Sequence, residues 1–127
     1  MDFWRQQRVL VTGGGGFFGS HVVEQIKKRR PAALSVPRHK EYDLRRLDRI
    51  EALLKKEKPD LILNLAAVCG GIGANRAQPG RFFYDNIVMG VQLMDAARRF
   101  NIKKFLQVGT VCSYPKFTPV PFKENDL

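Results

Sequence analysis

R-V-L-V-T-G-G-G-G-F-F-G-S-H, residues 8–21, is the stretch that decides the fold. Its apolar run Val9–Val11 is short enough for a buried parallel strand, and after Gly19 the apolar spacing becomes helical. A strand, a glycine-rich turn and a helix in this order are the context in which a glycine motif predicts phosphate binding. Glycines let the chain turn sharply and let a pyrophosphate approach free N–H groups where the helix starts. We therefore predict a nucleotide-binding turn, with a purely structural tight turn as the alternative.

Two glycine spacings overlap in this stretch. G-x-G-x-x-G runs from Gly14 to Gly19, and T-G-x-x-G-x-x-G runs from Thr12 to Gly19. The Walker A pattern does not fit, because no lysine precedes Ser20. The residues expected to bind the cofactor here are consecutive: Thr12, Gly13, Gly14, Gly15, Gly16, Phe17, Phe18 and Gly19.

Composition narrows the class of protein. The chain has 127 residues, enough for one domain, and no apolar segment long enough for a signal peptide or a membrane span, so we expect a cytoplasmic protein. Cys69 and Cys112 form neither a disulfide framework nor a metal-binding spacing, so no metal site is expected. The net charge of +10 suggests nucleic-acid binding, but the basic residues gather at predicted helix ends, where they complement helix dipoles. A solvated surface is the favoured interpretation.

The second strand, near Ala33–Val36, follows a helix over 19–30 and stops at Pro37. In a dinucleotide-binding unit its exit meets the adenosine ribose, where an acidic residue would bind the 2′-hydroxyl of NAD. The exit here is Arg38-His39-Lys40, which suits the 2′-phosphate of NADP. Arg38 is the best candidate because a guanidinium can bind phosphate through two hydrogen bonds. An exposed loop arginine is the alternative.

The remaining elements follow from apolar periodicity. Residues 42–44 predict a very short strand or a turn, with Asp43 placed to cap a helix that ends before Pro59. Residues 60–67 predict a central strand, whose small residues Ala66 and Ala67 leave room for a cofactor or simply pack. A loop over 68–80 precedes a helix ending near Phe100, and a fifth strand spans 105–108. The helical stripe consists of Phe83, Ile87, Gly90, Met94 and Ala97.

This order of elements predicts an α/β fold, a Rossmann-type doubly wound parallel sheet that is cut off after about its fifth strand. Ligands in such sheets bind beyond the carboxyl ends of the strands. The glycine turn, Arg38, residues 64–69 and residues 110–114 all fall on that edge. Their convergence is stronger evidence than any one of them.

Several motifs resemble the extended short-chain dehydrogenase/reductase family. They are the glycine turn, Asn64-Leu65-Ala66-Ala67, and Asn86 with Gly90 and Ala96-Ala97. Residues 70–86, G-G-I-G-A-N-R-A-Q-P-G-R-F-F-Y-D-N, and residues 109–116, G-T-V-C-S-Y-P-K, are similar to the GDP-L-fucose synthase branch of that family. The resemblance extends from Arg8 to Leu127.

The resemblance implies an NADP(H)-dependent enzyme that epimerises C3 and C5 of GDP-4-keto-6-deoxy-D-mannose and reduces C4. It assigns Thr110 to the substrate carbonyl and Cys112 to acid/base catalysis, where a strand-end hydroxyl and a small buried hydrophobe are the structural alternatives. Cys69 matches no family role, and we expect it to pack in the interior. Further cofactor-binding residues implied are Arg38, Asp43, Leu44, Leu65, Ala66, Ala67 and Asn86.

One family feature is absent. The family's reductases use a Tyr-x-x-x-Lys pair, and none of the three tyrosines here has lysine four positions on. We therefore interpret residues 1–127 as an incomplete N-terminal NADP-binding domain without its substrate domain, expected to be inactive alone and homodimeric as the full-length protein. The alternatives are another nucleotide-sugar epimerase or dehydratase of the extended family, and a non-catalytic NADP-binding module.

Overall fold

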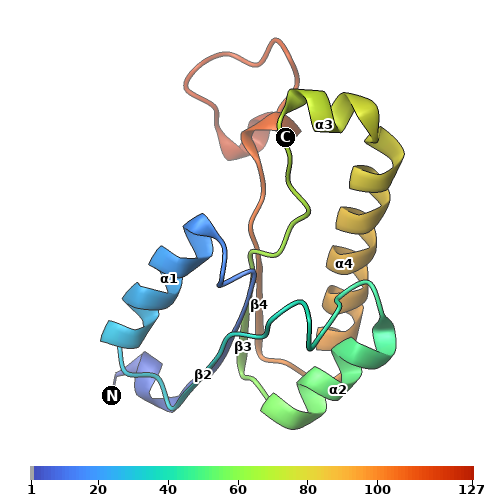
Figure 1. The fold of residues 1–127 in the computed structure, drawn as a ribbon. Helices are drawn as coiled ribbons and strands as arrows, with labels where there is room; N and C mark the ends of the chain where they lie inside the picture. The colour runs from blue at the N-terminus through green and yellow to red at the C-terminus, as the bar shows by residue number, and fades with distance from the viewer. Residues whose placement is uncertain (1) are drawn as a thin grey trace.

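The computed structural model describes residues 2–127, which form a four-stranded parallel sheet with helices on both faces (Figure 1). Among these residues the strand order is β2-β1-β3-β4. The elements in chain order are η1 (Phe3–Gln6), β1 (Arg8–Thr12), α1 (Phe17–Lys28), β2 (Ala33–Ser35), α2 (Leu47–Glu57), β3 (Leu61–Asn64), α3 (Ile72–Ala77), α4 (Pro79–Arg99), β4 (Lys104–Gln107), η2 (Val111–Ser113) and η3 (Glu124–Asp126).

Each face of the sheet has its own apolar core. On one face α1 covers β1, and Val23 and Ile26 pack with Val9, Val11 and Leu61. On the other face α2 and α4 lie side by side over the alternate strand positions, and the largest buried side chains there are Leu10, Ile50, Leu53, Leu54, Ile62 and Leu93. Strands buried on both faces read as unbroken apolar runs. The predicted doubly wound parallel sheet is confirmed.

The chain changes direction across the sheet at β1. From β1 it passes through α1 to β2, and from β2 through α2 it returns to β3 on the other side of β1. The carboxyl ends of β1 and β3 therefore flank the switch point of the sheet, which is where open α/β sheets bind ligands.

Of the two forms predicted for residues 42–44, a very short strand or a turn, the structure has the turn, so the described part of the chain has four strands. The N–H groups of Glu41 and Tyr42 both donate to the carbonyl of Arg38, so the backbone here closes a turn. Leu44 is buried in the core, which explains the apolar signal without a strand. The turn that was the alternative at this position is what forms.

The segment between β3 and α4 is more helical than predicted. The central strand ends at Asn64 rather than Ala67, and the expected loop 68–80 contains α3. The side chain of Asn75 donates to the carbonyls of Gly70 and Gly71, which holds the entry to α3. The following helix begins at Pro79, because proline suits the first position of a helix. The other predicted boundaries differ by one or two residues.

The long helix predicted from the spacing of Phe83, Ile87, Gly90, Met94 and Ala97 forms as α4, and most of this stripe lies outside the core. Phe83, Ile87 and Met94 are exposed, whereas Met89 and Leu93 pack in the core. The helix carries apolar residues on its outer face as well as its inner one, so periodicity alone did not distinguish the two. None of the helices within residues 2–127 is both long enough and apolar enough to cross a bilayer.

Candidate functional site

The turn between β1 and α1 is built so closely that side chains are excluded. Gly13 has a φ of +68°, and a Cβ there would lie 2.6 Å from the carbonyl carbon of Leu65. A Cβ on Gly19 would overlap the carbonyl oxygen of Gly13 and lie 2.7 Å from the Cα of Gly14. The glycines therefore let helix α1 and the end of β3 approach the turn as backbone against backbone.

This arrangement leaves the start of α1 with the features of an anion-binding site. Gly16 is the N-cap and no side chain caps the helix, so the N–H groups of Phe17, Phe18 and Gly19 have no acceptor within it. The rings of Phe17 and Phe18 are exposed, and Phe17 packs edge-on against His21. Both residues therefore offer backbone donors to the turn, and the helix dipole favours negative charge there.

Arg38 lies beside this turn. It follows β2 and is exposed, and its Nη1 atom would be 3.4 Å from a Cβ on Gly15. The exit of β2 thus brings a guanidinium next to the glycine backbone. An arginine in this place can bind a second phosphate with two parallel hydrogen bonds.

Asp43 and Leu44 follow in the loop before α2. The Oδ1 atom of Asp43 accepts from the backbone N–H of Arg45 at 3.0 Å, and its Oδ2 atom accepts from Nη2 of Arg45 at 2.8 Å. These hydrogen bonds to the Arg45 guanidinium lower the pKa of Asp43 to about 2, so its carboxylate stays charged at neutral pH. The expectation that Asp43 caps α2 is wrong, because Arg46 is the N-cap residue and Arg45 holds the carboxylate. The side chain of Leu44 lies in the core, which leaves only its backbone facing the loop.

The segment after β3 forms the other wall of the switch point. Leu65 and Ala66 are half-buried and Ala67 is exposed. Asn86 of α4 holds the next residue, since its Oδ1 accepts from the N–H of Val68 at 2.8 Å and its Nδ2 donates to the carbonyl of Val68 at 3.0 Å. Asn86 therefore fixes the path of the chain behind the candidate site.

Thr110 and Cys112 lie just beyond β4. The hydroxyl oxygen of Thr110 accepts from the backbone N–H of Cys112 at 3.2 Å, which leaves the hydroxyl hydrogen free to donate. Cys112 is exposed, so the alternative of a buried hydrophobe does not apply. Cys69 is also exposed, and the expectation that it packs in the interior is wrong. Within residues 2–127 no group of histidine, cysteine and carboxylate side chains is arranged to hold a metal ion.

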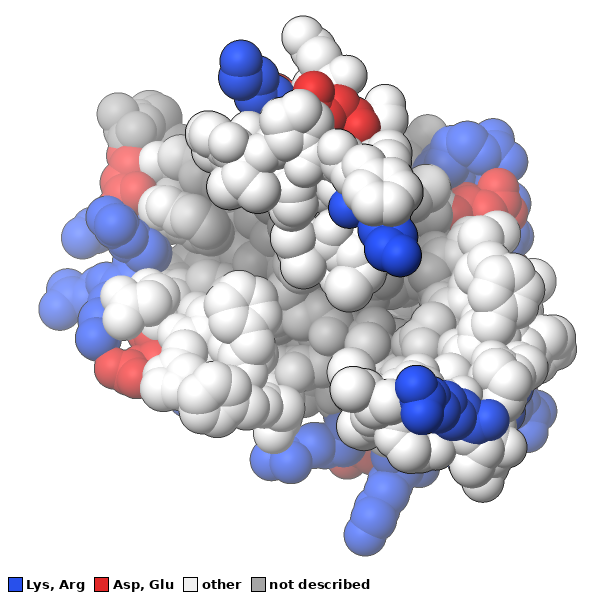
Figure 2. All heavy atoms as spheres, turned by 90° about the horizontal axis from the view of Figure 1, so that it is seen from above, with Lys and Arg blue, Asp and Glu red and all other residues white. Residues whose placement is uncertain are grey.

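Figure 2 looks down on the carboxyl edge of the sheet. Uncharged atoms occupy its middle, and most lysine and arginine atoms lie around the rim. Helices α1, α2 and α4 each have basic residues in their last turn, which places those charges at the opposite edge. The structure thus gathers the glycine turn, Arg38 and Leu65–Ala66 closely, with Thr110 at the exit of the next strand.

Sequence reasoning missed two polar residues near this edge. Asp85 of α4 is 5% exposed and pairs with Arg45 at 3.4 Å, which ties α4 to the loop before α2. Gln107, the last residue of β4, hydrogen-bonds the side chain of Asn64 at 2.7 Å. The available signal for Gln107 was its matching position beside Asn64 in the neighbouring strand.

Comparison with known proteins gives several relatives. The model of the NAD dependent epimerase/dehydratase family matches residues 9–127. GDP-L-colitose synthase of Yersinia pseudotuberculosis is 38% identical over 109 residues, which cover 86% of this chain and 35% of that protein. GDP-L-fucose synthase of Sinorhizobium fredii is 33% identical over 121 residues, which cover 95% of this chain and 38% of that protein. The chain therefore spans little more than a third of the length of these curated relatives.

A solved structure is also similar to this chain. The GDP-mannoheptose C4 reductase from Campylobacter jejuni, with NADP bound, superposes with a TM-score of 0.88 at 28% identity and covers 97% of this chain and 39% of that one. The glycine turn at the switch point, the doubly wound sheet and the family match over nearly the whole sequence all lead to one assignment. The chain belongs to the NAD dependent epimerase/dehydratase family.

Proposed function

We propose that residues 1–127 are the N-terminal, cofactor-binding part of an NADPH-dependent enzyme that converts GDP-4-keto-6-deoxy-D-mannose to GDP-L-fucose. One observation carries the proposal: the turn after β1 presents free backbone N–H groups where side chains are excluded, and Arg38 lies beside it. Curated relatives at 33–38% identity are named for synthesis of GDP-L-fucose and GDP-L-colitose, which supports a GDP-sugar as the substrate.

The residues present fit a dinucleotide. Gly13 and Gly19 let the backbone of the turn, of β3 and of α1 pack tightly, whereas a Cβ on Gly15 or Gly16 would meet no atom closer than 3.4 Å, so this side of the turn leaves the N–H groups of α1 open to a pyrophosphate. Arg38 would bind the 2′-phosphate, and Asp43 and Leu44 lie in the loop on the adenosine side. Leu65, Ala66 and Ala67 would line the far wall of the crevice, with Asn86 holding the chain behind them.

Thr110 and Cys112 would act on the sugar. When bound, NADPH supplies the hydride that reduces C4. The free hydroxyl hydrogen of Thr110 would donate to the 4-keto oxygen and stabilise the negative charge that develops there. Cys112 would be one member of an acid/base pair at C3 and C5, which are acidified by the ketone between them: one group removes the proton and the second delivers a proton to the opposite face.

A second candidate is the same chemistry on a different GDP-sugar. The 38% identity to the GDP-L-colitose synthase favours it, because that value exceeds the identity to the GDP-L-fucose synthase of Sinorhizobium fredii. Incubating the complete protein with NADPH and GDP-4-keto-6-deoxy-D-mannose, and identifying the product by mass spectrometry and NMR, separates the two.

The cofactor is tested by titrating the complete protein with NADPH and with NADH and following nucleotide fluorescence. We expect wild type to prefer NADPH and Arg38→Ala to bind NADPH about 10- to 100-fold more weakly, since hydrogen bonds to a charged group contribute roughly 1.5–3 kcal/mol. The affinity for NADH, which lacks the 2′-phosphate, should stay within about threefold.

Lys40→Ala is the matched control, because Lys40 is an exposed cation two residues further along the same loop. Lys40→Ala should leave the preference for NADPH over NADH unchanged. Equal affinity of wild type for the two nucleotides would refute the role of Arg38, and absence of binding to either would refute the proposed function itself.

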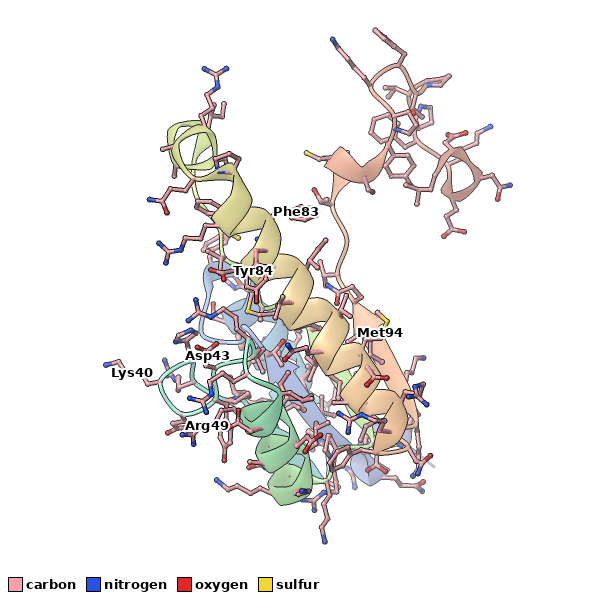
Figure 3. All side chains as sticks on the ribbon, turned by 90° about the vertical axis from the view of Figure 1, so that its right-hand side faces the viewer. Lys40, Asp43, Arg49, Phe83, Tyr84 and Met94 are labelled. Carbon is pink, nitrogen blue, oxygen red and sulfur yellow. The ribbon has the colours of Figure 1, made fainter. Side chains whose placement is uncertain are left out.

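A homodimer through α4 is part of the proposal. Phe83, Tyr84 and Met94 lie along the outer face of this helix (Figure 3), together with Ile87 and Val91. Their exposed fractions run from 48% to 68%. The same stripe on two copies is self-complementary under a twofold axis, and exposed apolar stripes of this kind mark association surfaces.

Val91→Glu should convert the complete protein from a dimer to a monomer, because the new carboxylate would be buried without a partner at the centre of the stripe. Sedimentation equilibrium at several concentrations measures this. Lys55→Ala changes the net charge equally from the exposed side of α2 and should remain dimeric. A monomeric wild type would contradict the dimer and leave the cofactor proposal untouched.

A further inference from the structure

A row of polar side chains crosses the sheet beneath the candidate site. Thr12, Asn64 and Gln107 occupy matching register positions at the carboxyl ends of β1, β3 and β4. The hydroxyl of Thr12 donates to Oδ1 of Asn64 at 2.5 Å, and Nδ2 of Asn64 donates to Oε1 of Gln107 at 2.7 Å. Thr12 and Asn64 are almost fully buried, at 0% and 2% exposed.

The two ends of this row lie against the two halves of the site. At one end Thr12 directly precedes Gly13, and its hydroxyl oxygen accepts from the N–H of Ala66 at 3.4 Å. At the other end Nε2 of Gln107 donates to the carbonyl of Val108 at 3.1 Å, two residues before Thr110. The N–H of Val108 in turn donates to the carbonyl of Asn64 at 3.3 Å. Hydrogen bonds therefore connect the glycine turn to the segment that carries Thr110.

The sheet does not need polar groups here to stay together. One register step earlier the same three strands pair at Val11, Leu63 and Leu106, which are all apolar. Apolar contacts are non-directional, whereas hydrogen bonds between amides fix both distance and orientation. A hydrogen-bonded network rigidifies the groups that it joins, and here Thr12 and Asn64 are buried while Gln107 is exposed at the end of the row. The row is thus suited to setting the relative position of the strand ends.

We propose that Asn64 and Gln107 are positioning residues: through the amide pair they hold the exit of β4, and with it Thr110, in place relative to the glycine turn. This inference rests on the proposed function for the meaning of Thr110 and the turn. Neither side chain needs to touch the sugar or the cofactor. The effect on turnover is large because displacing a reacting group by about 1 Å can reduce the rate about 100-fold.

The experiment uses Gln107→Met in the complete protein, which keeps the length of the side chain and removes its hydrogen bonds. We expect kcat to fall about 10- to 100-fold while the dissociation constant for NADPH changes less than about threefold. Gln107→Glu keeps an acceptor for Nδ2 of Asn64 and should restore most of kcat. Gln25→Met, on the exposed side of α1, is the matched control and should behave as wild type.

A second measurement does not depend on activity. Amide hydrogen exchange at residues 108–112 should be at least about tenfold faster in Gln107→Met than in wild type, with exchange in α1 unchanged. Wild-type kcat together with wild-type exchange in Gln107→Met would overturn the inference. Failure of wild type to bind NADPH would overturn the proposed function, while the exchange result would still decide whether the row positions residues 108–112.

Discussion

Replacing Gly19 with alanine should weaken NADPH binding about 100-fold in the complete protein. The added methyl group would overlap the carbonyl oxygen of Gly13 and lie 2.7 Å from the Cα of Gly14. Both are backbone atoms of the turn, so no side chain can rotate away and the start of α1 has to move. Overpacking of this kind costs roughly 1–3 kcal/mol, and the shifted helix no longer directs its N–H groups at the pyrophosphate. Calorimetric titration with NADPH measures the loss.

Two further glycine variants test whether the loss of NADPH affinity comes from the crowding at Gly19. Gly16→Ala tests the same turn, since its Cβ would be 3.4 Å from the carbonyl of Gly13, and it should bind within about fivefold of wild type. Gly73→Ala adds a methyl group in α3 with nothing within 4 Å and should change nothing. Circular dichroism verifies that each variant is folded. Wild-type NADPH affinity in a folded Gly19→Ala protein would contradict the proposal that backbone N–H groups at the start of α1 bind the pyrophosphate.

Thr110→Val should lower kcat about 100-fold and leave NADPH affinity unchanged. Valine keeps the shape of threonine and removes the hydroxyl hydrogen that is free to donate. Loss of one donor to a developing oxyanion typically costs 10²- to 10³-fold in kcat, or about 3–4 kcal/mol. The measurement is steady-state oxidation of NADPH by the complete protein with the 4-keto sugar nucleotide.

Thr118→Val is the matched control for this variant. Its hydroxyl donates to the carbonyl of Pro115 at 2.8 Å, in the segment beyond η2, so the same change is made away from the strand exit. It should keep kcat within about threefold of wild type, because a surface hydrogen bond contributes about 1 kcal/mol or less. An unchanged kcat in Thr110→Val would remove Thr110 from the chemistry.

The part of the fold that could be predicted from sequence is the part where local and long-range signals agree. Between Val9 and Gly19 the strand, the turn and the helix each have a pattern of their own, and the glycines are explained by contacts that the structure contains. The prediction for Arg38 depended only on where β2 ends, and Pro37 marks that end. The glycine turn and Arg38 are therefore found at the positions in the fold that the sequence predicts.

Other features depend on contacts that no local pattern encodes. Leu44 is apolar because it enters the core from a turn, which made residues 42–44 resemble a strand. Apolar residues surround most of α4, so its periodicity did not reveal which side faces the sheet. Asn64 and Gln107 are 43 residues apart, and only strand pairing makes them neighbours. Pairing between strands is the step that composition and periodicity leave undetermined.

The proposed diphosphate site and the proposed 2′-phosphate site lie on different segments, the turn after β1 and the loop after β2. This separation has a consequence for redesign of the cofactor preference. The proposed contacts of the turn come from main-chain atoms, and a Cβ on Gly13, Gly14 or Gly19 would lie within 3 Å of other atoms, whereas Arg38 lies in a separate, exposed loop. If the proposed roles hold, substitution of Arg38 should change the selectivity between NADPH and NADH without weakening the binding of the diphosphate at the turn. Substitutions at Arg38 are thus the first choice for changing the preference from NADPH to NADH, because they leave the packing of the glycine turn unchanged.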